Sequence, residues 1–258
     1  MPIFDSHAHY DDSVFDEDRG ALLSSLPRDG VCAVVNAASS LPSARASLSL
    51  AEQYPYIYAA VGIHPEEALS ATEADIAALR ALYAHPKAIA IGEIGLDYHY
   101  EDACPREIQR RWFEAQLALA KELDAPVIVH DREAHEDTMR LLRQYRPAGV
   151  LHCYSGSVEM LREVLRLGMY IGLGGAVTFK NARRPVEVAA AVPADRLLLE
   201  TDAPYMAPVP LRGKRCDSRM IAHTAARIAD IRGCTADELL EQTRKNACRL
   251  FHIAEQAL

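Results

Sequence analysis

The chain alternates along its whole length between short apolar runs and longer amphipathic segments. A short apolar run that ends in a polar residue or a glycine predicts a buried strand, and a longer segment with helical spacing of its apolar residues predicts a helix. Strands are expected at Pro2–Phe4, Val31–Val35, Ile57–Val61, Ala88–Ile91, Val127–Val129, Gly149–Leu151, Tyr170–Gly172 and Leu197–Leu199. Helices are expected at Asp18–Leu26, Ser43–Gln53, Thr72–Tyr83, Pro105–Leu123, Ala134–Gln144, Val158–Leu167, Ala182–Ala191, Ser218–Ile231 and Ala236–Leu250.

Eight strands that alternate with eight helices predict a (β/α)8 barrel of the TIM type, followed by one additional C-terminal helix. Capping-box spacing marks two helix starts, at Thr72 with Asp75 and at Thr235 with Glu238. An open, doubly wound sheet uses the same alternation and is the structural alternative. No G-x-G-x-x-G motif follows the first strand, which disfavours that alternative for a dinucleotide-binding protein.

Composition places the chain among ordinary globular proteins, because 50% of its 258 residues are hydrophobic and 25% are charged. No glycine-, serine- or proline-rich linker interrupts it, so residues 1–258 are expected to form a single domain. The formal net charge of −8 excludes coating of nucleic acid through overall charge. The chain has neither an apolar run long enough for a membrane span nor a basic leader, and its six scattered cysteines form no C-x-x-C pair. A soluble, cytoplasmic protein with reduced thiols is expected.

Polar side chains follow most of the expected strands directly. Parallel strands in a barrel present their carboxyl ends at one face, so these side chains should converge there. The series consists of His7 and His9 after the first strand, His64 after the third, Glu93 after the fourth, His130 after the fifth, His152 after the sixth and Asp202 after the eighth. An open sheet would hold some of them too far apart to meet, which favours the barrel.

Four imidazoles and two carboxylates suit two divalent ions with mixed nitrogen and oxygen ligands. Zinc, manganese, cobalt, nickel or iron is favoured by the nitrogen donors, and magnesium remains an alternative. Two ions, two carboxylates and a bridging hydroxide would leave the mouth with about one positive charge, which suits an anionic substrate. Glu200 is expected to point the other way from Asp202 by strand alternation, and either to be structural or to support the ligands from behind.

Seven motifs carry a resemblance to a known family. They are DSHAHY (5–10), GIHP (62–65), GEIGLDY (92–98), VIVHDRE (127–133), LHCYSG (151–156), ETDAPYMAP (200–208) and NACRLF (246–251). In these motifs the sequence resembles the TatD family of metal-dependent deoxyribonucleases, within the amidohydrolase superfamily of (β/α)8 barrels. The resemblance implies hydrolysis of DNA, including 3′→5′ exonuclease action on single strands.

The resemblance also implies two ligand sets. One metal would be held by His7, His9, Glu93 and Asp202, and a second by Glu93, His130 and His152. Glu93 would then bridge the two ions, and Asp202 would also accept the proton of the attacking water.

Substrate contacts are expected from His64, from Arg132 in the HDRE segment, and from Arg212 and Lys214 after the eighth strand. A second basic cluster, Lys180, Arg183 and Arg184, follows the seventh strand, and Tyr98, Tyr100 and Tyr205 could stack on bases. The chain departs from the family pattern in two places. Asp131 adds a negative charge near the mouth, and Cys216, Asp217 and Ser218 replace the usual asparagine, acid and proline in a loop expected to touch substrate.

Two other functions remain open. The same metals could hydrolyse an ester or amide, for example in the deacylation of mischarged D-aminoacyl-tRNA. A barrel retained as a non-enzymatic metal-binding scaffold ranks last, because a scaffold would be expected to have lost at least one ligand and none is missing.

Overall fold

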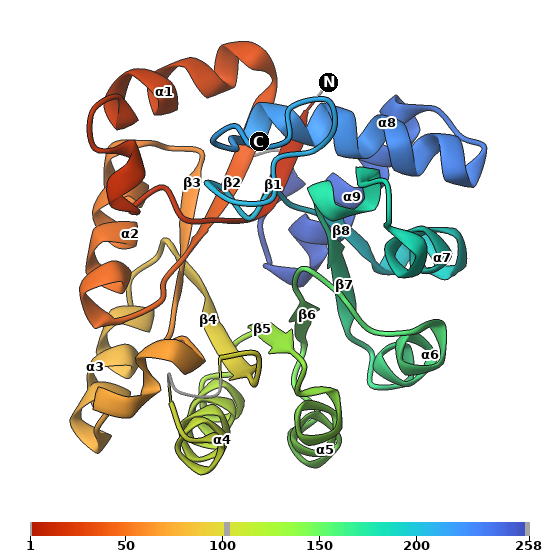
Figure 1. The fold of residues 1–258 in the computed structure, drawn as a ribbon. Coiled ribbons are helices and arrows are strands. Elements are labelled where there is room, and N and C mark those ends of the chain that lie inside the picture. The colour runs from red at the N-terminus through yellow and green to blue at the C-terminus, as the bar shows by residue number, and fades with distance from the viewer. Residues whose placement is uncertain (1, 101–103, 256–258) are drawn as a thin grey trace.

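The computed structural model describes residues 2–100 and 104–255. Eight strands form one sheet in which each strand pairs in parallel with the next along the chain. The helices lie around this sheet (Figure 1). The strands are β1 Ile3–Ala8, β2 Val31–Ala37, β3 Ile57–Val61, β4 Ala88–Asp97, β5 Val127–Arg132, β6 Gly149–Leu151, β7 Tyr170–Leu173 and β8 Leu197–Leu199.

Every expected helix is present, with ends within a few residues of the expected ones. They are α1 Arg19–Ser25, α2 Leu41–Gln53, α3 Glu73–Tyr83, α4 Arg106–Glu122, α5 His135–Tyr145, α6 Val158–Arg166, α7 Arg183–Ala191, α8 Ile221–Arg232 and α9 Ala236–Leu250. Both capping boxes form at the starts of α3 and α9. None of the helices within the described ranges combines the length and the apolar character that a membrane crossing requires.

The sheet nearly closes on itself between β1 and β8. Ala8 and Ala203 form a parallel bridge, and the amide of His9 donates to the carbonyl of Ala203 at 2.7 Å. The hydroxyl of Ser6 donates to the carbonyl of Leu199 at 3.0 Å. These contacts confirm the (β/α)8 barrel and exclude the open sheet.

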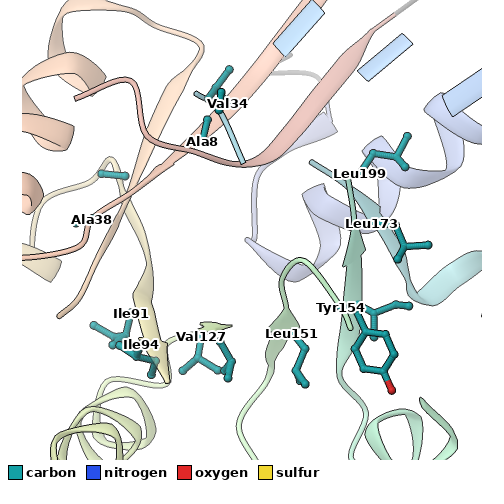
Figure 2. Close-up of a cluster of buried hydrophobic side chains, with 14 of the residues drawn as sticks. Ala8, Val34, Ala38, Ile91, Ile94, Val127, Leu151, Tyr154, Leu173 and Leu199 are labelled. Carbon is teal, nitrogen blue, oxygen red and sulfur yellow. The ribbon is translucent and has the colours of Figure 1, made fainter. Parts of the chain in front are cut away.

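Alternate residues of each strand pack on opposite sides of the barrel wall. On β2, Val34 belongs to the layer between strands and helices, whereas Ala33 and Val35 belong to a second cluster with residues such as Phe4 and Ile128. Figure 2 shows part of this layer between strands and helices, in which Ile91, Ile94, Val127 and Leu151 are labelled.

The end of α9 covers the amino-terminal end of the barrel. Phe251, directly after α9, stacks on Phe4 of β1 with 6.3 Å between ring centroids. Since one end is filled in this way, the carboxyl ends of the strands are left to form the site.

Candidate metal centre

The carboxyl ends of the strands surround a cavity of about 720 Å³. The six expected metal ligands meet there: five line the cavity, and His7 is fully buried beside them. The five lining residues are His9, Glu93, His130, His152 and Asp202. The expected convergence is therefore present.

Asp202 is held in place by the closure between β1 and β8. Its backbone adopts the left-handed conformation, with φ of 61°, and its amide donates to the carbonyl of His7 at 2.9 Å. Beside it, the buried Asp5 carboxylate accepts hydrogen bonds from the hydroxyls of Thr201, at 2.6 Å, and Ser218, at 2.7 Å. Burial raises the pKa of Asp5 to about 6. These bonds hold the first strand against the chain that carries Asp202.

Glu93 lies at the centre and divides its carboxylate oxygens between two groups of imidazoles. Oε1 is 2.6 Å from His152 Nε2 and 2.9 Å from His130 Nδ1. Oε2 is 3.2 Å from His7 Nε2 and 3.6 Å from His9 Nε2. Asp202 Oδ1 belongs with the second group, at 3.3 Å from His9 Nε2.

The donor set fits divalent cations. The Nδ1 atom of His9 bonds the carbonyl of Ala37 at 2.8 Å, and the Nε2 atom of His130 bonds Asp97 Oδ2 at 3.0 Å. Each bond fixes one ring nitrogen as the N–H donor, so the other nitrogen of a neutral ring faces the centre with its electron pair. Facing nitrogens lie only 3.0 Å apart between His7 and His9 and 3.2 Å apart between His130 and His152. A shared cation would stabilise such close electron-pair donors.

In the metal-free centre, the histidines fall into two groups, one with lowered and one with raised pKa values. Burial lowers the pKa of His7 to about 4 and that of His64 to about 3. Burial also opposes protonation of His9 and His130, but nearby carboxylates outweigh it. Asp202 and Glu93 raise the pKa of His9 to about 9, and Asp97 and Glu93 raise that of His130 to about 10. Without metal, protons therefore occupy positions where cations would sit.

Asp97 is a residue of the centre that the sequence reading missed. It is the last residue of β4, only 2% exposed, and bonds His130 on the side away from Glu93. Gln109 of α4 holds Asp97 by accepting from its amide and donating to its carbonyl, both at 2.8 Å. The available signal was strand alternation, which predicts that Glu93 and Asp97 lie on the same side of β4.

Glu200 lies behind His152, in the supporting role that the sequence analysis allowed, although it is not turned away from the centre. Its Oε1 accepts from the amide of Cys153 and lies 3.9 Å from His152 Nδ1. Strand alternation gives no reason for Glu200 and Asp202 to point in opposite directions, since residues two apart on a strand share a face, and β8 in any case ends at Leu199. Gly172 on β7 provides the space, since a Cβ there would lie 2.1 Å from Glu200 Oε2. Burial raises the pKa of Glu200 to about 8.

The candidate substrate contacts divide between the cavity and its surroundings. His64 and Arg132 line the cavity, as do the exposed rings of Tyr100 and Tyr205. Among the described residues that line the cavity, Arg212 and Lys214 do not appear; both are exposed on the loop after β8.

Tyr98 and the segment 216–218, which the sequence analysis placed among possible substrate contacts, do not face the cavity. Tyr98 does not reach the cavity as a stacking ring, because it is 9% exposed and donates to Asp137 at 2.8 Å. Cys216, Asp217 and Ser218 do not form a substrate-facing surface either, since all three are buried. Their role is to join the loop after β8 to β1, through the bond from Ser218 to Asp5.

The expected positive mouth is also incomplete as a description, because the cavity wall carries many further acids. Arg132 is the one arginine or lysine among the described lining residues. The acids outside the predicted ligand set are Asp11, Asp12, Glu66, Glu67, Asp97 and Asp131. Asp131 has a local partner, since it accepts from His135 Nδ1 at 2.7 Å.

Comparison with known proteins identifies the lineage of this site. The model of the family described as TatD related DNase matches residues 4–252. The chain belongs to the TatD family. It is 41% identical to the metal-dependent hydrolase YabD of Bacillus subtilis over 97% of this chain and 99% of that protein. It is 38% identical to the 3′-5′ ssDNA/RNA exonuclease TatD of Musicola paradisiaca over 98% of this chain and 99% of that one.

Solved structures agree with this membership. The TatD homologue YjjV of Escherichia coli K12 superimposes with a TM-score of 0.91 at 32% identity, over 98% of both chains. A phosphotriesterase homology protein of Escherichia coli shares the fold at a TM-score of 0.69 and 14% identity, over 96% of this chain and 98% of that one. The chain is thus a metal-dependent hydrolase of the TatD family with an amidohydrolase-like barrel.

Proposed function

We propose that this TatD-family hydrolase cleaves phosphodiester bonds of DNA, acting on single strands from the 3′ end, with two divalent ions in the cavity. The observation that carries the proposal is the division of the two Glu93 oxygens between two groups of histidines, which is the arrangement a bridging carboxylate needs. The name of the Musicola relative, a 3′-5′ ssDNA/RNA exonuclease, supports the choice of substrate.

Under this proposal one ion is held by His7, His9, Glu93 and Asp202, and the other by Glu93, His130 and His152. When bound, two such ions supply an activated water and stabilise charge on the phosphate oxygens. Their identity stays within the zinc, manganese, cobalt, nickel, iron and magnesium group that the donor set accepts.

Asp202 takes the proton of the attacking water. Asp202 contacts the Nε2 atoms of His7 and His9 through Oδ1, which leaves Oδ2 to accept that proton at the cavity surface. Burial tends to raise the pKa of Asp202, but His9 and His7 outweigh this and hold it below its usual range. The group is therefore ionised and ready as a base at neutral pH.

His64 and Arg132 position the phosphate. Nδ1 of His64 accepts from the amide of Glu66 at 3.3 Å, so its neutral ring carries the proton on Nε2, 3.6 Å from Glu93 Oε1. That N–H suits a phosphate oxygen better than a metal. The Arg132 guanidinium lies 5.1 Å from the centroid of the Tyr100 ring, so both can contact one nucleotide. Arg212 and Lys214 would contact phosphates outside the cavity.

The test is a comparison of two substrates with one preparation of metal-loaded protein. We expect release of mononucleotides from the 3′ end of a single-stranded DNA and no comparable turnover of an aminoacyl ester. Cleavage of the ester alone would overturn the proposal.

That ester is the second candidate substrate, because one observation favours it. The wall acids Asp11, Asp12, Glu66 and Glu67 could receive the cationic α-amino group of an aminoacyl-tRNA. The scaffold alternative is disfavoured, since all six candidate ligands converge.

A further inference from the structure

We propose that a single-stranded DNA leaves the metal centre across a basic arc on the rim, formed by the loops after β7 and β8. The arc is defined by five side chains: Lys180, Arg183, Arg184, Arg212 and Lys214. This inference rests on the proposed function for its substrate, and it names where the rest of the strand is held.

The sign of the charge changes from one side of the rim to the other. Residues 174–186, from the loop after β7 into the first turn of α7, and residues 203–215, in the loop after β8, contain six arginines and lysines and no acid. Residues 11–18, after β1, contain five acids and no arginine or lysine, and residues 64–75, after β3, contain four acids and neither base. A protein with a net charge of −8 thus concentrates cations on one side of its mouth.

The two basic loops form one continuous surface. The amide of Val209 donates to the hydroxyl of Thr178 at 2.8 Å, which joins the loop after β8 to the loop after β7. The guanidinium of Arg212 lies over the ring of Phe179, 3.7 Å from its centroid. Because Phe179 precedes Lys180, this contact places the cations of both loops side by side.

Most cations of the arc are available to a ligand. Lys180, Arg184, Arg212 and Lys214 are exposed, and none has a carboxylate within ion-pair distance among the described residues. Arg183 is paired with Glu187 at 2.9 Å. The neighbouring Arg215 is excluded from the arc because it binds Asp18 at 2.6 Å.

The arc begins at the cavity. Met206, in the loop after β8, lines the cavity, and its carbonyl lies against Gly175, where a Cβ would approach to 2.0 Å. The loop after β7 is therefore packed directly behind the cavity wall. Asp12 borders the arc, because it accepts from the hydroxyl of Tyr205 at 3.0 Å. Glu66 and Glu67, in the loop after β3, lie across the mouth and would repel a phosphate chain there. Attraction on one side and repulsion on the other define a single path for a polyanion.

The occupant fits the chemistry of the site. Four exposed cations without ion-pair partners among the described residues match the phosphates of a nucleic-acid chain. Neither of the two segments that carry them, residues 174–186 and 203–215, contains an acidic residue to bind a basic group of a protein partner. Such contacts hold a nucleic acid with little sequence dependence and with strong dependence on salt. The strand would keep its reacting phosphate in the cavity and its remaining phosphates on the arc.

Binding without metal isolates the arc from catalysis. We would measure fluorescence anisotropy of a 20-nucleotide oligo(dT) with the full chain in EDTA, over a series of salt concentrations. The test variant carries Lys180→Ala, Arg184→Ala and Lys214→Ala; Arg212 is kept because it packs on Phe179. The matched control carries Arg28→Ala, Lys121→Ala and Arg166→Ala, three exposed cations that precede β2, β5 and β7 and so belong to the amino-terminal end of the barrel.

We expect the test variant to bind at least about tenfold more weakly at 0.1 M salt, with a salt slope smaller by up to about 2, and the control to stay within about twofold of the parent. Equal losses in both variants, or an unchanged test variant, would overturn the arc. The arc would also be overturned if the test variant lost binding to vesicles containing phosphatidylserine while its affinity for oligo(dT) stayed unchanged. Hydrolysis of bis(4-nitrophenyl) phosphate and of oligo(dT) by the metal-loaded parent tests the reaction separately. An inactive parent that still binds through the arc would reject the proposed function and retain the arc.

Discussion

Glu93 and its surrounding imidazoles form a buried polar group that the protein stabilises by hydrogen bonds from outside the ring of ligands. Burial tends to raise the pKa of Glu93, yet His152, His7 and His64 hold it well below its usual range. Asp97 and the carbonyl of Ala37 orient His130 and His9 from behind. The chemistry at the centre thus also depends on groups outside the proposed ligand set, which fix the ligand rings in place.

Replacing Asp202 tests the proton acceptor. Asp202→Asn keeps the shape and one oxygen, but an amide cannot accept a proton at neutral pH. We expect kcat on single-stranded DNA at saturating metal to fall about 10²- to 10⁴-fold while the protein stays folded. Metal content measured on the same sample should show that the site formed by His130 and His152 is still occupied.

The control for this variant is Asp12→Asn, which alters a cavity acid bonded to Tyr205 rather than a candidate ligand. Its kcat should stay within a few-fold of the parent. Near-normal turnover of Asp202→Asn with both ions bound would remove Asp202 from the mechanism.

Replacing Asp97 tests the orientation of a ligand. In Asp97→Asn, the amide can still face His130 but no longer presents a negative charge to its Nε2–H. We expect about 10- to 100-fold weaker metal affinity at the site formed by Glu93, His130 and His152, measured by competition with a chromogenic chelator.

Asp131→Asn serves as the matched control, because Asp131 is also a lining acid but bonds His135 and Thr138 instead of a candidate ligand. Its metal affinity should remain within about twofold of the parent. If both variants bind metal like the parent, Asp97 does not position His130.

At the scale of elements, the sequence predicted the repeating strands and helices and the polar residues at the strand ends, but not the contacts that single residues make with distant parts of the chain. Apolar runs predict strands because a strand inside a barrel wall is buried on both faces, and polar residues at their ends predict the ligand set because all these ends meet. The direction of Glu200 was predicted wrongly because residues two apart on a strand share a face, and because β8 ends one residue before Glu200. The loop of Cys216–Ser218 was assigned to the surface because polar loop residues resemble a surface, whereas Ser218 is buried by a partner over 200 residues away in sequence.

Helix α4 illustrates a second kind of information that the pattern does not contain. Gln109 and Gln116 lie two turns apart on its buried face. Gln109 binds the backbone of Asp97 at the end of β4, and Gln116 binds the backbone of Ile63, two residues after β3. Buried amides on a helix thus replace the sheet partners that the strand ends lack. From sequence alone they read as ordinary polar positions.

Gln116→Ala would remove that replacement. The amide of Ile63 donates to Gln116 Oε1 at 2.7 Å, and its carbonyl accepts from Nε2 at 3.0 Å, both buried. Leaving the two groups unpaired should lower the free energy of unfolding by about 2–4 kcal/mol, measured by urea denaturation.

Gln144→Ala is the control, since its side-chain bond to Glu114 is exposed, and it should change the free energy of unfolding by less than about 0.5 kcal/mol. A change below about 1 kcal/mol in Gln116→Ala would mean that the backbone of Ile63 finds other partners.

For the molecule as a whole, protons and cations compete for the same centre. At pH 7.5 the metal-free protein keeps His9 and His130 protonated, with pKa values of about 9 and about 10, and keeps His7 and His64 neutral. Since a metal binds only the neutral imidazole, loading both ions should release about two protons. Isothermal titration calorimetry with manganese, in buffers that differ in heat of ionisation, counts them.

The same values give the pH dependence of folding stability. The folded pKa of His9 and His130 lies above the unfolded value of about 6.5, so their contribution to stability is complete below that pH, declines as pH rises from about 6.5, and is lost once pH has passed about 9 to 10. The lowered pKa values of His7 and His64 act in the opposite direction, costing stability as pH falls below about 6.5. Thermal unfolding in EDTA should therefore show the highest Tm near pH 6.5, with Tm falling both as pH rises toward about 9 to 10 and as pH falls below 6.5, and His223→Ala, at an exposed position of α8, should leave that profile unchanged. Loading with manganese should raise Tm most on the alkaline side, where the protons that compete with the ions are lost. Release of less than about half a proton at pH 7.5 would contradict the assignment of His9 and His130 as the two protonated ligands.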